Sequence, residues 1–245
     1  MRFYNDFIGN DLSNVIEPFT SGDSERQFNE NKANQSSDWY YANTTISYSF
    51  NEYGHRSKNI SEIDLGNYII FTGCSHTAGI GLELEKTYPY LVSKKLGVDY
   101  YNLAMAATGI DVLEYNLLTW FAKVKQKPKC VIIQWPDHTR FASYQEGYDL
   151  LQERSSWSDD PVDRSLIING EDIGMFYARK ELSRKLIAQT IDVPVHTFNY
   201  GGQVAYGITS NKLRQVDKAR DLSHAGIKSN ENFAELICET ILNHK

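Results

Sequence analysis

Short apolar runs alternate with stretches of helical periodicity along residues 67–245. The runs are rich in β-branched and aromatic residues, which is typical of buried strands. The longer stretches repeat their apolar residues at the spacing of an amphipathic helix. The pattern therefore predicts strands over 68–72, 98–103, 130–135, 193–198 and about 215–219, and helices over 88–96, 110–125, 176–190 and 229–243.

This alternation of strands and helices predicts the fold class. Parallel strands need crossover connections, and helices on those connections cover the faces of the sheet. We expect a three-layer α/β/α sandwich, of flavodoxin-like type, around a central parallel sheet of about five strands. Residues 138–175 interrupt the alternation as a long excursion. In such a sheet, ligands bind at the carboxyl ends of the strands.

Residues 1–66 have a different composition, rich in Asn, Ser, Asp and Tyr. The stretch 22–37 has almost no apolar residues and predicts a long loop, whereas alternation over 46–50 predicts a strand. The segment is too polar to form a convincing core of its own. We therefore expect an N-terminal extension, 1–66, packed on a main α/β domain, 67–245.

Composition and charge narrow the class of protein. The chain has 245 residues, 41% of them hydrophobic, a formal net charge of −6 and no run of basic residues, which argues against a nucleic-acid partner. The cysteines Cys74, Cys130 and Cys238 lie far apart, which predicts buried free thiols and argues against a zinc site. No stretch has the length of a membrane span and no signal core is visible, so we expect a soluble, cytoplasmic protein without a membrane partner. The sequence leaves the oligomeric state open.

Candidate chemistry begins at Ser75, which follows the first predicted strand of the main domain. A hydroxyl where a strand ends and a helix begins lies near backbone N–H groups without helical partners, which suits a nucleophile whose product is an oxyanion. The alternative is that Ser75 caps the helix. Asp221 and His224, after the last predicted strand, have a spacing that lets the carboxylate reach Nδ1 and leaves Nε2 for a serine proton. The alternative there is a solvated loop with a capping Asp.

Oxyanion donors are expected on two further loops. Small residues including Ala107 and Gly109 follow the second strand and allow close approach of a ligand, or close packing of helix on sheet. Asp137, His138 and Arg140 follow the third strand. Arg140 could bind a carboxylate or phosphate of a substrate, or form a surface ion pair.

Several segments, in this order, resemble the sequence blocks of the SGNH (GDSL-type) hydrolases. Residues 73–81, containing Gly-Cys-Ser-His-Thr, resemble block I, and 102–109 resemble the Asn-x-Gly-x-x-Gly of block II. Residues 131–138 occupy the place of block III, and Asp-Leu-Ser-His at 221–224 matches block V. The stretch 51–56 is similar to the Asn-x-x-Gly-x-Arg lead-in of some bacterial members.

The resemblance implies a metal-free and cofactor-free serine hydrolase. It implies Ser75 as nucleophile, His224 as general base and Asp221 as the partner that orients the base. Members of this family are esterases, lipases, acyl-thioesterases and carbohydrate O-acetylesterases, and some relatives are O-acyltransferases.

The chain departs from the family pattern at four places. Cys74 stands where Asp is usual. The block II glycine appears as Ala107, where an alanine is tolerated as a donor if its φ is negative, or is shifted to Gly109. No Asn follows the third strand; the ring N–H of His138 could donate in its place, but an ionised Asp137 could not. His76, beside the nucleophile, either touches substrate or lies solvated at the helix start.

We therefore expect a serine esterase that removes a small acyl group, acetyl, from a carbohydrate or another small ester. The first alternative is an O-acyltransferase to a sugar acceptor, and the second is a non-catalytic binding or structural module. A cysteine hydrolase through Cys74 is a remote further option. Aromatic residues around Tyr144, Tyr148, Trp157 and Tyr177 could stack on a sugar or pack in the core or a lid.

Overall fold

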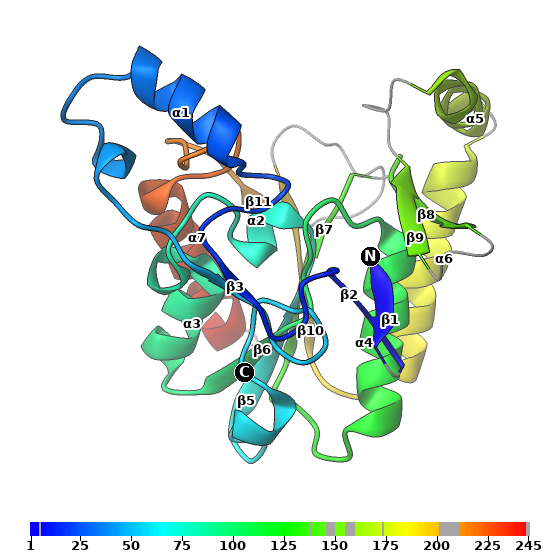
Figure 1. Cartoon of the computed structure of the whole chain (residues 1–245). Helices are drawn as coiled ribbons and strands as arrows, with labels where there is room; N and C mark the ends of the chain where they lie inside the picture. The colour runs from blue at the N-terminus through cyan, green and yellow to red at the C-terminus, as the bar shows by residue number, and fades with distance from the viewer. Residues whose placement is uncertain are drawn as a thin grey trace.

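The computed structural model describes residues 1–4, 6–137, 139–145, 150–154, 160–172, 174–200 and 211–243. Its centre is a five-stranded sheet in which every neighbouring pair is parallel (Figure 1). In spatial order the strands are β11 (Asn211–Leu213), β10 (Val195–Tyr200), β7 (Val131–Trp135), β5 (Tyr68–Thr72) and β6 (Asp99–Asn102).

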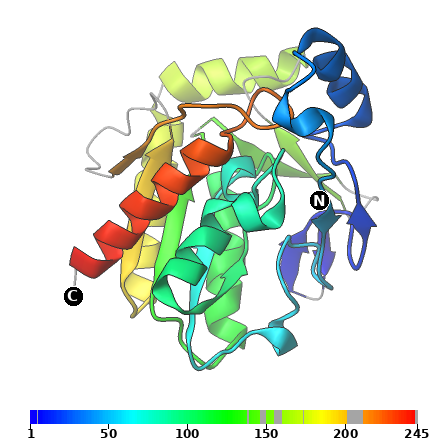
Figure 2. The ribbon, with the colours of Figure 1, turned by 90° about the vertical axis from the view of Figure 1, so that its left-hand side faces the viewer.

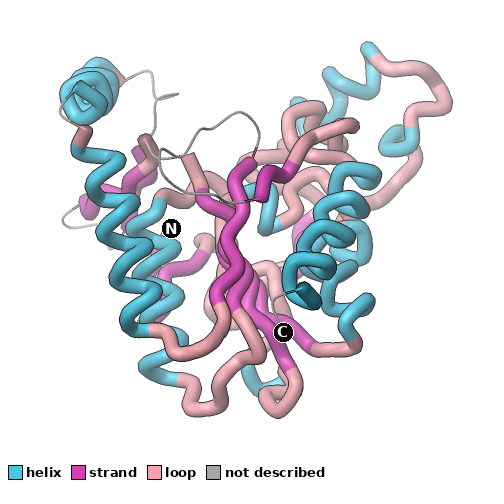
Figure 3. The backbone as a smooth tube through the Cα atoms, turned by 180° about the vertical axis from the view of Figure 1, so that it is seen from behind, coloured by secondary structure: helices cyan, strands magenta, loops and turns pink. Residues whose placement is uncertain are grey.

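Helices cover both faces of this sheet, as the tube seen from behind shows (Figure 3). On one face α3 (Tyr88–Leu96) and α7 (Ile227–Asn243) pack on each other and on the sheet (Figure 2). On the other face lie α4 (Ile110–Lys123) and α6 (Met175–Thr190). The predicted three-layer α/β/α fold class is confirmed.

The alternation of β5 explains the two cores. Tyr68 and Ile70 pack in the core with α4, whereas Ile69 and Phe71 pack in the core with α3 and α7. All four side chains are buried, because successive residues of a strand point to opposite faces and this strand is covered on both.

The predicted loop over 22–37 is wrong, because a helix, α1 (Glu25–Asn34), lies within it. Ser24 caps this helix by accepting a hydrogen bond from Gln27 N at 3.2 Å. Its aromatic residue Phe28 packs beside Phe19 and Trp39. The helix buries no residue fully, so the sequence carries no apolar stripe to reveal it.

The predicted strand at 215–219 is also displaced, since the last strand of the sheet is β11 and the chain between Leu213 and α7 is irregular. The N–H groups of Val216 and Asp217 donate to Ser229 Oγ at 2.9 and 3.1 Å. A side chain therefore satisfies this backbone in place of a neighbouring strand.

The N-terminal segment also contributes to smaller sheets. β1 (Arg2–Tyr4) and β2 (Phe7–Gly9) join β8 (Phe141–Gln145) and β9 (Leu150–Arg154) from the 138–175 excursion, in the order β2-β1-β9-β8. The remaining elements are β3 (Ile16–Glu17), β4 (Tyr48–Ser49), α2 (Ser75–Ala78), α5 (Pro161–Asp172), η1 (Tyr40–Ala42), η2 (Ile60–Glu62) and η3 (Leu84–Lys86). β4 confirms the strand predicted at 46–50.

The three cysteines are buried and free, as predicted. In the part of the chain that the structure describes, no helix combines the length and apolar character needed to cross a membrane.

Candidate active site

Ser75 lies at the carboxyl end of β5, as the first residue of the short helix α2. The N-cap position belongs to Cys74, which has an extended backbone and makes no side-chain cap bond. Ser75 is therefore not the cap that the alternative interpretation expected. Its side chain is buried and its N–H lies in the first helical turn, where no intrahelical acceptor exists.

Asp221 and His224 are joined as the sequence spacing predicted. His224 Nδ1 makes a short hydrogen bond with Asp221 Oδ2, and Asp221 Oδ1 accepts from the N–H groups of Ser223 and His224 at 3.3 and 3.1 Å. The Asp221 side chain is 1% exposed and that of His224 is 17% exposed. A buried carboxylate with these donors fixes the ring, and Nε2 is the ring nitrogen left to face a reactant.

His76 connects the two loops. Its ring stacks on Tyr200 with centroids 3.6 Å apart and meets the His224 ring edge-on at 4.8 Å. Burial, and then the charges of His224 and Arg140, hold the pKa of His76 well below its usual value. Its Nδ1 is buried and has no hydrogen-bond partner among the described residues. His76 is therefore a half-buried ring packed between Tyr200 and His224.

Gln215 binds the backbone of His224 and contacts Tyr200 in turn, and the sequence analysis missed both residues. Tyr200 OH donates to Gln215 Oε1 at 2.7 Å, and Gln215 Nε2 donates to the His224 carbonyl at 2.9 Å. Gln215 fell inside a predicted strand, and Tyr200 stood just beyond another, so no motif marked them.

The loop after β6 is tied to the loop that carries Ser75. Thr108 Oγ1 donates to the Gly73 carbonyl at 3.0 Å, and Asn102 Nδ2 donates to the Thr77 carbonyl at 2.9 Å. A Cβ on Gly109 would lie 2.6 Å from the Arg140 carbonyl oxygen, so glycine serves close packing there. Ala107 has φ +68°. It therefore does not meet the condition, a negative φ, under which its backbone N–H was expected to serve as an oxyanion donor.

The loop after β7 contains the remaining candidates. Asp137 Oδ1 accepts from Thr139 N at 2.8 Å and Thr139 Oγ1 at 2.6 Å, so this carboxylate is engaged in its own turn. Arg140 is half-buried, and its charge acts on the ring of His76. His138 lies outside the described residues, as do Tyr148 and Trp157 and the side chains of Tyr144 and Tyr177.

Gln134, buried near the end of β7, is a third residue that the sequence analysis missed. Its Oε1 accepts from Cys74 Sγ at 3.1 Å and from Thr77 Oγ1 at 3.2 Å. Tyr88 OH donates to Thr77 Oγ1 at 2.6 Å. An amide inside an otherwise apolar strand is a signal that could have marked Gln134, since buried polar groups need partners. The Cys74 thiol is thus engaged with Gln134.

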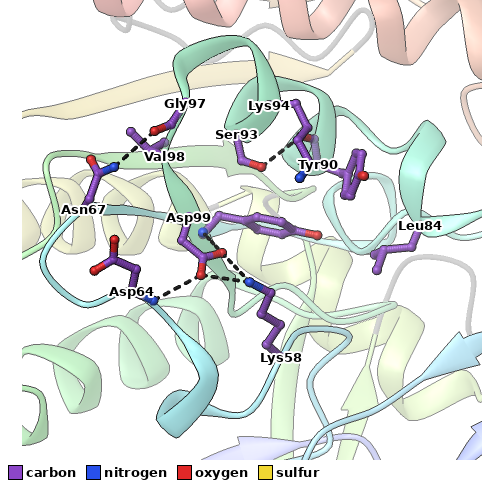
Figure 4. Close-up of a pocket in the computed structure, with 11 residues that line it drawn as sticks. Lys58, Asp64, Asn67, Leu84, Tyr90, Ser93, Lys94, Gly97, Val98 and Asp99 are labelled. Carbon is purple, nitrogen blue, oxygen red and sulfur yellow. Dashed lines mark hydrogen bonds and ion pairs between the residues drawn. The ribbon is translucent and has the colours of Figure 1, made fainter.

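A cavity of about 380 Å³ lies away from these residues, around the amino end of β6 (Figure 4). Its polar groups bind one another: Lys58 Nζ pairs with Asp99 at 2.9 Å, and Asn67 Nδ2 donates to the Gly97 carbonyl at 3.1 Å. No cluster of His, Cys, Asp or Glu suited to a metal ion occurs in the described ranges. The carboxyl edge of the sheet is therefore the candidate active site.

No family model matches the chain, and no curated protein matches it in sequence. Among solved structures, it is similar to a carbohydrate esterase described as having divergent catalytic and non-catalytic binding functions, at 13% identity and a TM-score of 0.46 over 74% of this chain and 65% of the other. It is similar to a carbohydrate esterase family 2 enzyme with a carbohydrate binding domain from Corynascus thermopiles (Myceliophthora fergusii), at 14% identity and a TM-score of 0.45 over 71% and 65%.

A third similar structure is a lipolytic protein of the G-D-S-L family from Veillonella parvula, at 12% identity and a TM-score of 0.44 over 70% of this chain and 96% of the other. The chain spans just under two thirds of the length of the two carbohydrate esterase structures. Since every one of these TM-scores is below 0.5, the function has to rest on the residues of this chain.

Proposed function

We propose that this chain is an ester hydrolase of the SGNH type, with Ser75 as nucleophile, His224 as general base and Asp221 as the residue that orients His224. The observation that carries the proposal is the buried Asp221 carboxylate bonded to His224 Nδ1. This bond fixes the tautomer in which Nε2 can accept a proton from a serine hydroxyl. The edge-on contact of His224 with His76, the neighbour of Ser75, supports the pairing of the two loops.

The proposed reaction has two steps. Ser75 Oγ attacks the ester carbonyl carbon while its proton passes to His224 Nε2, and Asp221 stabilises the imidazolium. The oxyanion receives a hydrogen bond from the N–H of Ser75. Its collapse breaks the ester C–O bond, and His224 returns the proton to the leaving alcohol. In the second step His224 takes a proton from water, and the oxygen of that water attacks the carbonyl carbon of the acyl-serine. The bond from this carbon to Ser75 Oγ breaks, His224 returns the proton to Ser75 Oγ, and the carboxylic acid is released.

The proposed substrate is a small acyl ester, acetyl, on a carbohydrate. The ring of His76, which stacks on Tyr200, lies against the ring of His224 and leaves less room beside it, which favours a small acyl group. A cavity of about 360 Å³ lies beside α2 and the loop after β6, between Ala78 and Ala106 on one side and the N-terminal segment on the other. Asn10 and Ser21 line it with amide and hydroxyl groups, which suits the hydroxyl-rich alcohol part of a sugar ester.

Turnover of p-nitrophenyl acetate by the wild type, Ser75→Ala, His224→Ala and Asp221→Asn tests the proposal. Ser75→Ala and His224→Ala should reduce turnover to background, and Asp221→Asn should lower kcat by about 10³–10⁴-fold because the ring loses its orienting carboxylate. Cys74→Ala is the matched control at the neighbouring position and should retain activity. Loss in Cys74→Ala with retention in Ser75→Ala would contradict the proposal and indicate a cysteine hydrolase.

The same assay separates hydrolysis from acyl transfer. With added glucose as acceptor, a hydrolase releases acetate and leaves the glucose unmodified. Transfer of most acetyl groups to glucose would instead support the O-acyltransferase alternative. Absence of any Ser75-dependent turnover would support the non-catalytic module.

A further inference from the structure

A buried ion pair joins the N-terminal segment to the residue before Asp221. Arg220 Nε donates to Asp23 Oδ2 at 2.9 Å, and a second guanidinium nitrogen donates to the same oxygen at 2.7 Å. The side chains of Arg220 and Asp23 are 3% and 0% exposed. The Arg220 guanidinium also lies over the rings of Phe19 and Phe28, at 4.7 and 5.2 Å from their centroids. A pair this deeply buried resists displacement, because separating it leaves an uncompensated buried charge.

Two side chains of helix α1 bind backbone carbonyls of the same loop. Gln27 Nε2 donates to the Asp221 carbonyl at 2.9 Å, and Asn31 Nδ2 donates to the Arg220 carbonyl at 3.1 Å. Figures 1 and 2 show α1, in dark blue, beside the orange segment that carries these carbonyls. The polar face of α1, which gave no core signal in the sequence, therefore contacts the loop of Asp221 and His224.

Tyr48 links this loop to the one that follows Ser75. Its hydroxyl donates to Asp23 Oδ2 at 2.5 Å and accepts from Gly81 N at 2.8 Å. The Gly81 carbonyl in turn accepts from Arg220 N at 3.1 Å. One buried hydroxyl thus connects the ion pair with the chain just after α2.

Arg56 fixes the end of α2 itself. Its fully buried guanidinium donates to the carbonyls of Ala78 and Leu82 at 3.2 and 2.7 Å, and it lies 4.5 Å from the centroid of the Tyr48 ring. The Ala78 carbonyl lies at the C-terminus of the helix that begins with Ser75, where a cation is favourable. Tyr48 therefore contacts both Asp23, which pairs with Arg220 beside Asp221, and Arg56, which binds the end of α2.

We propose that Asp23, Tyr48 and Arg56 are positioning residues, which set the Asp221–His224 loop at the distance and angle to Ser75 that proton transfer needs. The proposal rests on the proposed serine-hydrolase function. It gives Asp23 and Tyr48 a role in the reaction through Arg220 and Gly81, separate from the substrate contacts proposed for Asn10 and Ser21. A shift of about 1 Å between nucleophile and base can cost about 10²-fold in rate, so small losses in this network should reach the chemistry.

Tyr48→Phe tests the proposal, because it removes only the bridging hydroxyl and keeps the ring beside Arg56. The matched control is Tyr40→Phe, an exposed tyrosine of the same segment whose hydroxyl donates to Glu83 Oε1 at 2.8 Å. We expect Tyr48→Phe to lower kcat for p-nitrophenyl acetate about tenfold with KM within about twofold, and Tyr40→Phe to match the wild type. Partial unfolding would also lower apparent kcat at unchanged KM, so kcat is expressed per active site titrated with a fluorophosphonate.

Two activity-independent readouts accompany the kinetics. In Tyr48→Phe the downfield proton resonance of His224 Nδ1–H should shift or broaden, and exchange of the Gly81 amide should accelerate at least tenfold. Equal kcat, an unchanged His224 resonance and equal Gly81 exchange in Tyr48→Phe and Tyr40→Phe would overturn the positioning proposal. If the wild type shows no turnover, the proposed function fails, and the His224 resonance and Gly81 exchange still decide whether Tyr48 positions the loop.

Discussion

The backbone of Ala107 adopts a conformation that glycine favours, with φ +68°. An L-residue in this region brings Cβ close to the following carbonyl oxygen, at a cost of about 1–2 kcal/mol. By the resemblance of residues 102–109 to block II, Ala107 stands at the position of a glycine. The loop holds it through Thr108, which donates to the Gly73 and Met105 carbonyls.

Ala107→Gly should therefore raise the free energy of unfolding by about 0.5–1 kcal/mol, the strain relieved less the greater entropy of glycine in the unfolded chain. Urea denaturation measures the change. Ala106→Gly is the control, since Ala106 has no positive φ and should lose roughly 0.4–1 kcal/mol on substitution. Destabilisation by both variants alike would show that φ at Ala107 carries no strain.

His55 is a buried neutral ring, with Nδ1 3.0 Å from Tyr101 OH and Nε2 3.0 Å from the Ile8 carbonyl. Burial lowers the pKa of His55 to about 4 from its usual 6.5. The unfolded chain then binds the proton of His55 at higher pH than the folded chain does. Between these two pKa values the unfolded state is protonated at His55 and the folded state is not, so stability falls as the pH drops through that window.

From pH 7.5 to pH 5, His55 should account for a loss of about 2 kcal/mol in the free energy of unfolding. His55→Gln keeps polar atoms but does not titrate, so its stability should fall less over this range, although it is lower at pH 7.5. Urea denaturation at the two pH values measures both slopes. The depressed pKa of His76 acts in the same direction, and His76→Gln gives its separate share. Equal slopes in His55→Gln and the wild type would contradict the burial argument.

Among the secondary-structure elements, those with strong apolar periodicity were predictable and those held by polar contacts were not. β5, β7, α3 and α4 fall within a few residues of their predicted bounds, because their buried side chains dictate the pattern. α1 was missed because its contacts to the Asp221 loop are made by Gln27 and Asn31.

The residues of the candidate site also divide into those that the sequence could predict and those that it could not. Asp221 and His224 could be paired from spacing alone, since the bond is local in sequence. Gln134, Tyr200 and the Asp23–Arg220 pair join residues far apart in the chain, and no local signal could place them together. Their arrangement follows from the folded sheet, whose carboxyl ends collect loops from distant parts of the sequence.

Filling the cavity between the N-terminal segment and the loop after β6 should weaken substrate binding. Ser21→Trp should fill part of the roughly 360 Å³ beside the exposed Ser21. We expect KM for glucose pentaacetate to rise about tenfold, a loss of about 1.4 kcal/mol in binding, with Ser75 labelling by a small fluorophosphonate unchanged. Ser21→Ala is the matched control and should behave as the wild type. An unchanged KM in Ser21→Trp would remove this cavity from the account of substrate binding.

At the scale of the whole molecule, apolar side chains of the N-terminal segment pack in the same cores as those of residues 67–245. Phe7 lies in the core that contains Trp120, and Tyr48 and Phe50 pack with Ile80 and Ala219. These contacts agree with an extension packed on a main domain. The division into 1–66 and 67–245 stays a prediction.

A chain lacking residues 1–66 should fail to unfold cooperatively. Removal of this segment exposes the apolar side chains that Phe7, Tyr48 and Phe50 cover, and it leaves the buried Arg220 without Asp23. Thermal denaturation followed by circular dichroism, with near-ultraviolet signal as a measure of packing, tests this. A cooperative transition near that of the full chain would show that residues 67–245 form an independent domain.

If the folded molecule activates Ser75, fluorophosphonate labelling followed by intact-mass measurement will detect it. We predict one adduct on the wild type and on Cys74→Ala, no adduct on Ser75→Ala and a much slower one on His224→Ala. No adduct on the wild type, under conditions that label a control serine esterase completely, would contradict it.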